Sequence, residues 1–190
     1  MRNELLEASN NDYFCYGLSL QDFDYTKRLV SEFISAAHER LDGIKAEAIA
    51  KHPSPDIHSE IISDYAHYLY VDTQYLWHFC IWRFQAIFEG IISDFLGDTV
   101  RKPLIGLKAK LDATRNTGFH IDDSDYEECL AWGRLRNAFS HAPPEQYRPV
   151  EILDSDISSL YELLVRLVTN LTRKKEAEQD APSNGDKRLV

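Results

Sequence analysis

The stretch YLWHFCIWRFQAIFEGII, residues 75–92, decides the fold of this chain. Its apolar side chains cover nearly every side of the helix that they predict, which is typical of a central helix in a bundle. The stretch belongs to a longer helical segment, residues 56–96, for which a break near Asp72 and Thr73 is plausible because forty residues is long for one helix. We interpret its aromatic side chains as core packing.

Helical patterns also flank this segment on both sides. A helix over residues 21–51, with Ser19 or Asp22 as its cap, ends at His52-Pro53-Ser54-Pro55. After the central segment we expect three more helices. The first covers residues 103–115, and the second follows the cap Asp122-Asp123-Ser124-Asp125 and ends at Ala142-Pro143-Pro144. The third runs from Asp154 or Asp156 to Leu171. The sequence therefore predicts an all-α, up-and-down bundle of four to five helices over residues 1–172, followed by a disordered charged tail, 173–190.

The composition agrees with one ordinary globular domain. The chain has 190 residues, of which 44% are hydrophobic and 27% charged. Cys15, Cys80 and Cys129 are far apart and include no Cys-x-x-Cys pair, which indicates a reducing compartment and no zinc site. The N-terminus has no apolar signal segment, and the longest apolar run is too short to span a bilayer. We therefore expect a soluble, cytoplasmic protein without membrane contact.

The charge is unevenly distributed along the chain. The net charge is −10, and residues 1–100 carry 16 acidic and 7 basic side chains. Residues 101–118 reverse this balance, with Arg101, Lys102, Lys108, Lys110 and Arg115 against a single acid, Asp112. The overall charge argues against a passive nucleic-acid coat, whereas the basic segment still allows a local basic face.

Chemistry is concentrated in the segment Arg136-Asn137-Ala138-Phe139-Ser140-His141, called the motif below. Arginine offers a permanently charged fork for phosphate oxygens, and histidine can accept or donate a proton near neutral pH. Asn137 precedes His141 by four residues and shares its face if the helix persists. Arg136 and His141 are about 140° apart on an unbroken helix, so they converge only at a frayed end or across two chains.

The motif resembles the signature of the HEPN superfamily, in which Arg precedes His by four to six residues before the final helix of a small α-helical bundle. The resemblance implies a metal-independent endoribonuclease without a cofactor, often a toxin or defence component, whose homodimer brings two motifs together. It implies that His141 transfers protons, Arg136 binds the scissile phosphate and Asn137 supports both. RNA is then the substrate and an antitoxin a possible protein partner. Side chains that could contact RNA are Arg134, Ser140, Arg101 and Lys108.

A second segment matches the same pattern. Arg115-Asn116-Thr117-Gly118-Phe119-His120 also places Asn after Arg and His five residues later. Because Asn-Thr-Gly is turn chemistry and no final helix directly follows, we favour Arg136 and His141 and keep Arg115 and His120 as the alternative catalytic pair.

Other clusters give weaker signals. His67, His78 and Cys80 lack a convergent further ligand for a metal, so these histidines are more simply core or surface residues. Glu89 needs a partner if it is buried, and Arg136 is one possibility, although a helix-edge glutamate is the simpler interpretation. The acids 122–125 could hold a cation but are sufficiently explained as a helix N-cap. The alternative function for the whole chain is a non-catalytic helical module that binds a protein partner.

Overall fold

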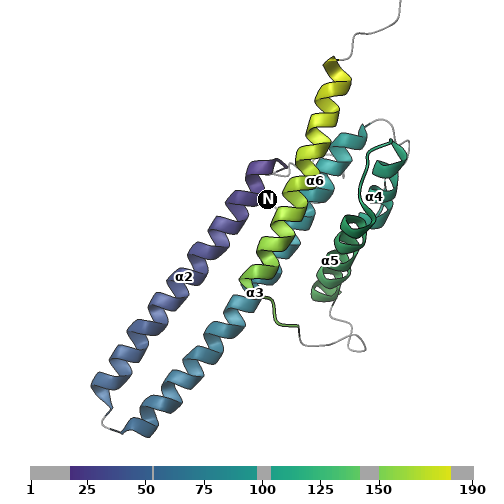
Figure 1. The fold of residues 1–190 in the computed structure, drawn as a ribbon. Helices are drawn as coiled ribbons and strands as arrows, with labels where there is room; N and C mark the ends of the chain where they lie inside the picture. The colour runs from purple at the N-terminus through teal and green to yellow at the C-terminus, as the bar shows by residue number, and fades with distance from the viewer. Residues whose placement is uncertain (1–17, 53, 98–103, 142–149, 181–190) are drawn as a thin grey trace, which may run out of the picture.

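A computed structural model describes residues 18–52, 54–97, 104–141 and 150–180 of the chain. Within these ranges the chain forms helices and no strand, which confirms the predicted all-α, up-and-down bundle (Figure 1). The helices are α2 (Leu20–Lys51), α3 (Pro55–Leu96), α4 (Leu107–Asn116), α5 (Asp123–His141) and α6 (Asp154–Asp180). None of the described helices is both long enough and apolar enough to cross a membrane.

Helix α3 is the centre of the bundle, as its apolar sequence predicts. It packs against all four of the other helices. Phe84, Ile87 and Ile92 are completely buried, and the ring of Phe23 from α2 meets Phe84 edge-on with centroids 5.5 Å apart. The helix is continuous from Pro55 to Leu96, so the break considered near Asp72 and Thr73 does not occur.

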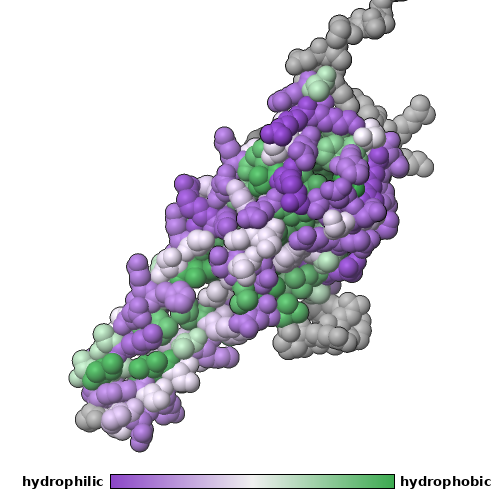
Figure 2. Space-filling model, in the orientation of Figure 1, coloured by the Kyte–Doolittle hydropathy of each residue, from purple (hydrophilic) through white to green (hydrophobic). Residues whose placement is uncertain are grey.

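Burial along α3 begins only at Trp77, because all its buried side chains lie between Trp77 and Leu96. Residues 55–76 of α3 pair with residues 33–51 of α2 in a two-helix projection, called the arm below, which extends beyond the other helices (Figure 1). Figure 2 shows hydrophobic residues exposed along the arm. The exposed large side chains of the arm include Phe33, Ile49, Ile57, Tyr65 and Tyr68. The arm therefore leaves an apolar face largely uncovered.

One of the helix ends predicted from the sequence is confirmed, and two are wrong. Helix α2 begins with a capping box, in which Asp22 accepts a hydrogen bond from the backbone N–H of Ser19 at 2.9 Å. Helix α4 begins at Leu107 rather than at residue 103, because Gly106 adopts a positive φ of 85° and interrupts the helical path. Helix α6 continues to Asp180, so residues 173–180 are helical where the sequence predicted disorder, while residues 181–190 lie outside the described residues.

A side-chain amide fixes the entrance of α6 against α3. The Nε2 group of Gln74 donates to the carbonyl of Ile152 at 3.0 Å, and its Oε1 accepts from the Ile152 N–H at 2.8 Å. Ile152 is buried, so both of its backbone polar groups need a partner there. These two bonds thus hold the entrance of α6 in place against α3.

Candidate nucleic-acid interface

A cleft of about 500 Å³ lies where α3, α4 and α5 meet. Four of the residues predicted for function line it, namely Arg134, Arg136, Asn137 and Lys108. The remaining lining residues come from α3, from the start of α4 and from α5, and they are Gln85, Glu89, Ile105, Gly106, Leu107, Leu130 and Gly133. Arg101, the fourth expected cationic contact, lies outside the described residues.

Arg136 is partly buried in the wall of this cleft. Its Nη1 group donates to the Oδ1 atom of Asn137 at 3.0 Å, so the two residues of the motif are linked. Its Nε–H is buried and has no acceptor within the described part of the chain. A buried donor without an acceptor costs roughly 1–3 kcal/mol. The Nε–H of Arg136 is therefore an unsatisfied donor in the wall of the cleft, as is the buried Nε–H of Arg115 near the turn before α5.

His141 lies at the exposed end of α5. The helix persists through His141, so Arg136 and His141 are about 140° apart around its axis and do not converge within one chain. Asn137 and Arg134 precede His141 by four and seven residues and share its face. Ser140 also belongs to this last turn, where its hydroxyl donates to the backbone carbonyl of Arg136 at 3.1 Å.

Glu89, which lines the cleft, belongs to a partly buried ion pair. Lys110 donates to Glu89 Oε2 at 2.9 Å, and Gln85 Nε2 donates to Glu89 Oε1 at 2.7 Å. The side chains of Lys110 and Glu89 are only 15% and 18% exposed. Lys110, and not Arg136, is therefore the ion-pair partner of Glu89. The sequence missed Lys110 because it lies on another helix, 21 residues away.

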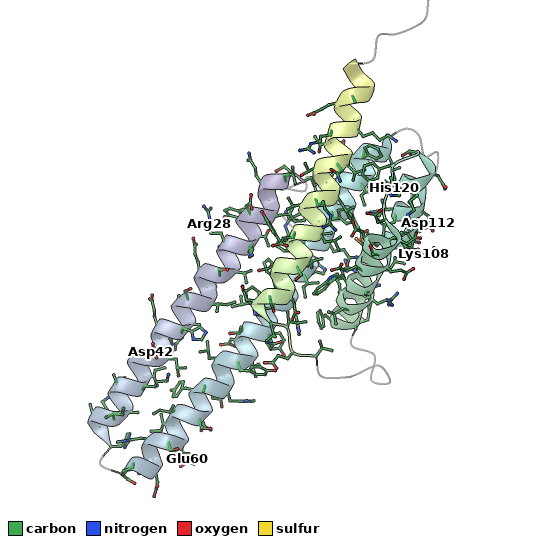
Figure 3. The ribbon with its side chains drawn as sticks, in the orientation of Figure 1. Arg28, Asp42, Glu60, Lys108, Asp112 and His120 are labelled. Carbon is green, nitrogen blue, oxygen red and sulfur yellow. The ribbon has the colours of Figure 1, made fainter. Side chains whose placement is uncertain are left out.

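Lys108 lines the outer edge of the cleft and is already hydrogen-bonded. It donates to Asp112 at 2.7 Å and to the Tyr126 hydroxyl at 3.1 Å, and these two contacts raise its pKa above the ordinary range. Figure 3 shows Lys108 beside Asp112 on α4. Its charge is partly offset, so Arg134 and Arg136 are the stronger candidates for binding an anion.

The alternative pair, Arg115 and His120, is engaged in local structure. Arg115 donates to the carbonyl of Ile121 at 2.7 Å and to Asp123 at 3.0 Å, and its guanidinium lies 4.1 Å from the centre of the Tyr126 ring. His120 is exposed and contacts Asp122 at 2.7 Å. These contacts connect the two ends of the turn between α4 and α5, which gives Arg115 a structural role.

The acids of residues 122–125 each contact a basic side chain instead of facing one another. Asp123 binds Arg115, Asp122 contacts His120, and Asp125 accepts from Arg166 of α6 at 2.7 Å. Within the described residues, no three histidine, cysteine or acidic side chains are grouped as a metal site would require. The acidic segment therefore acts as a link between helices.

His78 is a residue that the sequence did not connect with the motif. Its ring stacks on Phe139, the fourth residue of the motif, with centroids 3.7 Å apart. Its Nε2 atom is buried without a partner in the described chain, and burial lowers the pKa of His78. The spacing of His78 from His67 and Cys80 gave no hint of this contact, since Phe139 is distant in sequence.

Comparison of the chain with protein-family models, with curated proteins and with solved structures finds no match. The assignment of a function therefore depends on the side chains that line the cleft and on the motif at its edge.

Proposed function

We propose that this protein is a HEPN-type endoribonuclease that cleaves RNA without a metal ion, as a toxin or defence component. The observation that carries the proposal is the cleft in which Arg134, Arg136 and Asn137 lie together beside the turn that bears His141. Two arginines suit a phosphodiester, because their guanidinium groups donate hydrogen bonds to its oxygens and carry the opposite charge.

The proposed reaction uses the ribose 2′-OH of the substrate as nucleophile. The 2′ oxygen attacks the adjacent phosphorus, the bond from phosphorus to the 5′ oxygen breaks, and a 2′,3′-cyclic phosphate and a 5′-OH result. A base must take the 2′ proton and an acid must protonate the leaving oxygen, and one chain offers one histidine in the motif. Arginine stabilises the charge that develops on the phosphate.

A second copy of the chain would supply the second histidine and would also place an arginine opposite His141. Tyr75, Phe79 and Trp82 support this arrangement, because they are 69%, 46% and 45% exposed and follow one another at spacings of four and three residues. Such spacing creates the apolar seam along which two helices pair. These three residues, called the aromatic stripe below, lie beside Gln85 and Glu89 on α3, so a homodimer along the stripe would border the cleft.

The test is cleavage of single-stranded and looped RNA in the presence of EDTA. We expect products with cyclic-phosphate ends and no cleavage of DNA, which lacks the 2′-OH. Arg136→Ala should lose more activity than Arg136→Lys, because lysine keeps the charge but not the two-pronged geometry. RNA binding should weaken as salt rises. Loss of all cleavage in EDTA, or equal cleavage of DNA, would contradict the proposal.

A second candidate function is a helical interaction module that binds a protein partner, such as an antitoxin. The observation that favours it is a groove of about 420 Å³ in the arm, lined by Phe33, Leu41, Ile44, Tyr65 and Tyr68 among others. If the purified protein leaves every RNA intact and His141→Ala does not change RNA binding, this function becomes the better explanation.

A further inference from the structure

We infer that the cleft is a subsite for one unpaired nucleotide of the RNA strand, with its phosphate at Arg134 and Arg136 and its base against Gln85. The inference deepens the proposed function and rests on it, because it names the part of the substrate that the cleft takes. It adds Gln85 and Ile105 as residues that contact the base.

One end of the cleft is suited to a phosphate. Arg134 is exposed on α5, and the buried Nε–H of Arg136 has no acceptor among the described residues. The N-terminus of α4 opens into the same space, since Gly106, Leu107 and Lys108 all line it. Gly106 provides no side-chain cap there, so the first N–H groups of α4 need an acceptor. Two arginines and an uncapped helix start thus line the same cleft, and both are groups that bind anions.

Gln85, which also lines the cleft, is suited to accept from a hydrogen-bond donor. Gln85 is 8% exposed, and its Nε2 group is committed to the carboxylate of Glu89 at 2.7 Å. A carboxylate accepts, so this bond fixes which end of the Gln85 amide is the oxygen. Within the described chain no group donates to that oxygen. The ion pair between Glu89 and Lys110 holds the amide in place.

The rest of the lining is largely apolar. Leu107 and Leu130 line the cleft, and Gly133 allows α5 to approach α4 closely, because a Cβ atom there would lie 3.0 Å from Leu107 Cδ2. Ile105 also lines the cleft although it is 91% exposed. Apolar side chains can pack against the face of any base, while an amide acceptor meets the donor that every base carries on its pairing edge.

The direction of the bound strand follows from α5. Arg134, Asn137 and His141 lie in succession on one face of the helix, so a strand anchored in the cleft continues toward His141. A base inside a duplex is stacked and paired and cannot reach Gln85. The cleft therefore selects single-stranded or looped RNA, and the nucleotide that it holds lies next to the one that is cleaved.

The test measures binding separately from cleavage. Full-length protein is titrated with fluorescent single-stranded oligonucleotides whose 2′ positions are all methylated, so that the proposed reaction cannot occur. We expect Gln85→Met to weaken binding roughly 5- to 10-fold, the loss expected for one hydrogen bond. Ile105→Ala should weaken it about 3-fold through lost packing. Ile57→Ala, an exposed isoleucine on the arm, is the matched control and should bind as the wild type does.

Two further arms make the result decisive. One abasic position should weaken binding to the wild type more than binding to Gln85→Met, which has already lost the hydrogen bond to the base, and a methylated duplex should bind all variants equally. If Gln85→Met does not fold, Ile105→Ala and the abasic series decide alone. Equal binding of intact and abasic strands by the wild type, or unchanged binding by Ile105→Ala, would overturn the inference. Base-dependent binding without any cleavage of ordinary RNA would support the nucleotide subsite and contradict the proposed nuclease activity. Cleavage without base-dependent binding would support the nuclease activity and contradict the subsite.

Discussion

The imidazole of His78 lies flat against the ring of Phe139, with centroids 3.7 Å apart and planes inclined by 20°. This contact joins the central helix to the middle of the motif. Burial lowers the pKa of His78, so folding favours its neutral form. The unfolded chain, with an ordinary pKa of about 6.5, binds the proton more readily. The stability that depends on neutral His78 is present above that pKa and is lost as pH falls below it.

His78→Phe should therefore make stability less dependent on acid. Phenylalanine retains the stacking on Phe139 and cannot take up a proton, so the fall in the free energy of unfolding between pH 7 and pH 5 should be smaller than in the wild type. Urea titrations at several pH values measure this. His38→Phe replaces an exposed histidine of α2 and serves as the control, which should follow the wild type. Identical pH profiles for both variants would contradict the assignment.

The pair of Lys110 and Glu89 should be more important for stability than surface ion pairs. Lys110→Met leaves a partly buried carboxylate without its cation and should cost about 3 kcal/mol. The double variant with Glu89→Leu should recover much of this loss, because neither charge remains. Arg28→Ala breaks the pair with Glu32, whose side chains are both 67% exposed, and should cost about 0.5 kcal/mol or less. Chemical denaturation of the four proteins would show whether the expected order holds.

Gln74 should be necessary for docking of α6. Gln74→Ala removes both hydrogen bonds to the backbone of Ile152 and leaves two buried polar groups without partners, at a cost of roughly 1–3 kcal/mol. The exposed Gln21→Ala at the start of α2 should change stability by less than about 0.5 kcal/mol. Thermal unfolding followed by circular dichroism can compare them. An equal effect of both substitutions would show that the paired hydrogen bonds do not hold α6.

Substitutions in the motif and in the segment 115–120 should have different effects on RNA cleavage and on stability. His141→Ala should abolish RNA cleavage, while His120→Ala should leave it within a few-fold of the wild type. Arg115→Ala should lower the melting temperature, because Arg115 connects Ile121, Asp123 and Tyr126 at the turn before α5. Arg136→Ala should lose activity with little change in melting temperature, since its buried Nε–H has no acceptor to lose. Cleavage that depends on His120 and not on His141 would identify Arg115 and His120 as the working pair.

The aromatic stripe should determine assembly. Light scattering at micromolar concentration should give about twice the monomer mass of 21.9 kDa for the wild type. Trp82→Glu should yield the monomer, because a charge in an apolar seam opposes pairing. Tyr70→Glu changes an equally exposed residue of α3 outside the stripe and should leave the dimer intact. A wild-type monomer would remove the composite site from the proposed reaction.

Much of the fold could be predicted because local signals agreed with tertiary packing. The apolar stretch of residues 75–92 predicted a central helix, and Ser19 with Asp22 predicted a cap that forms. The start of α4 could not be placed, because Pro103 is an acceptable first helical residue and the positive φ of Gly106 depends on its surroundings. The charged end of α6 lacks apolar residues, and local charge patterns did not reveal that the helix continues.

The candidate site was predictable in its residues and not in its geometry. Spacing placed Asn137 and His141 on one face and separated Arg136 from them, and the unbroken α5 has this arrangement. The contacts of Glu89 with Lys110 and of His78 with Phe139 join different helices. No spacing rule within one helix can supply such pairs, because they depend on how helices pack.

The uneven burial along α3 has a consequence for how the molecule unfolds. Residues 55–76 have no buried side chain, and the facing part of α2 contributes only Leu41 and Ala48. The outer turns of the arm therefore form a separate, weaker cooperative unit, which opens without disturbing the packing around Phe84. Amide hydrogens should exchange rapidly there and more slowly with each turn toward Ile92. A single free energy of unfolding would then describe the bundle, but it would be larger than the free energy that keeps the arm folded.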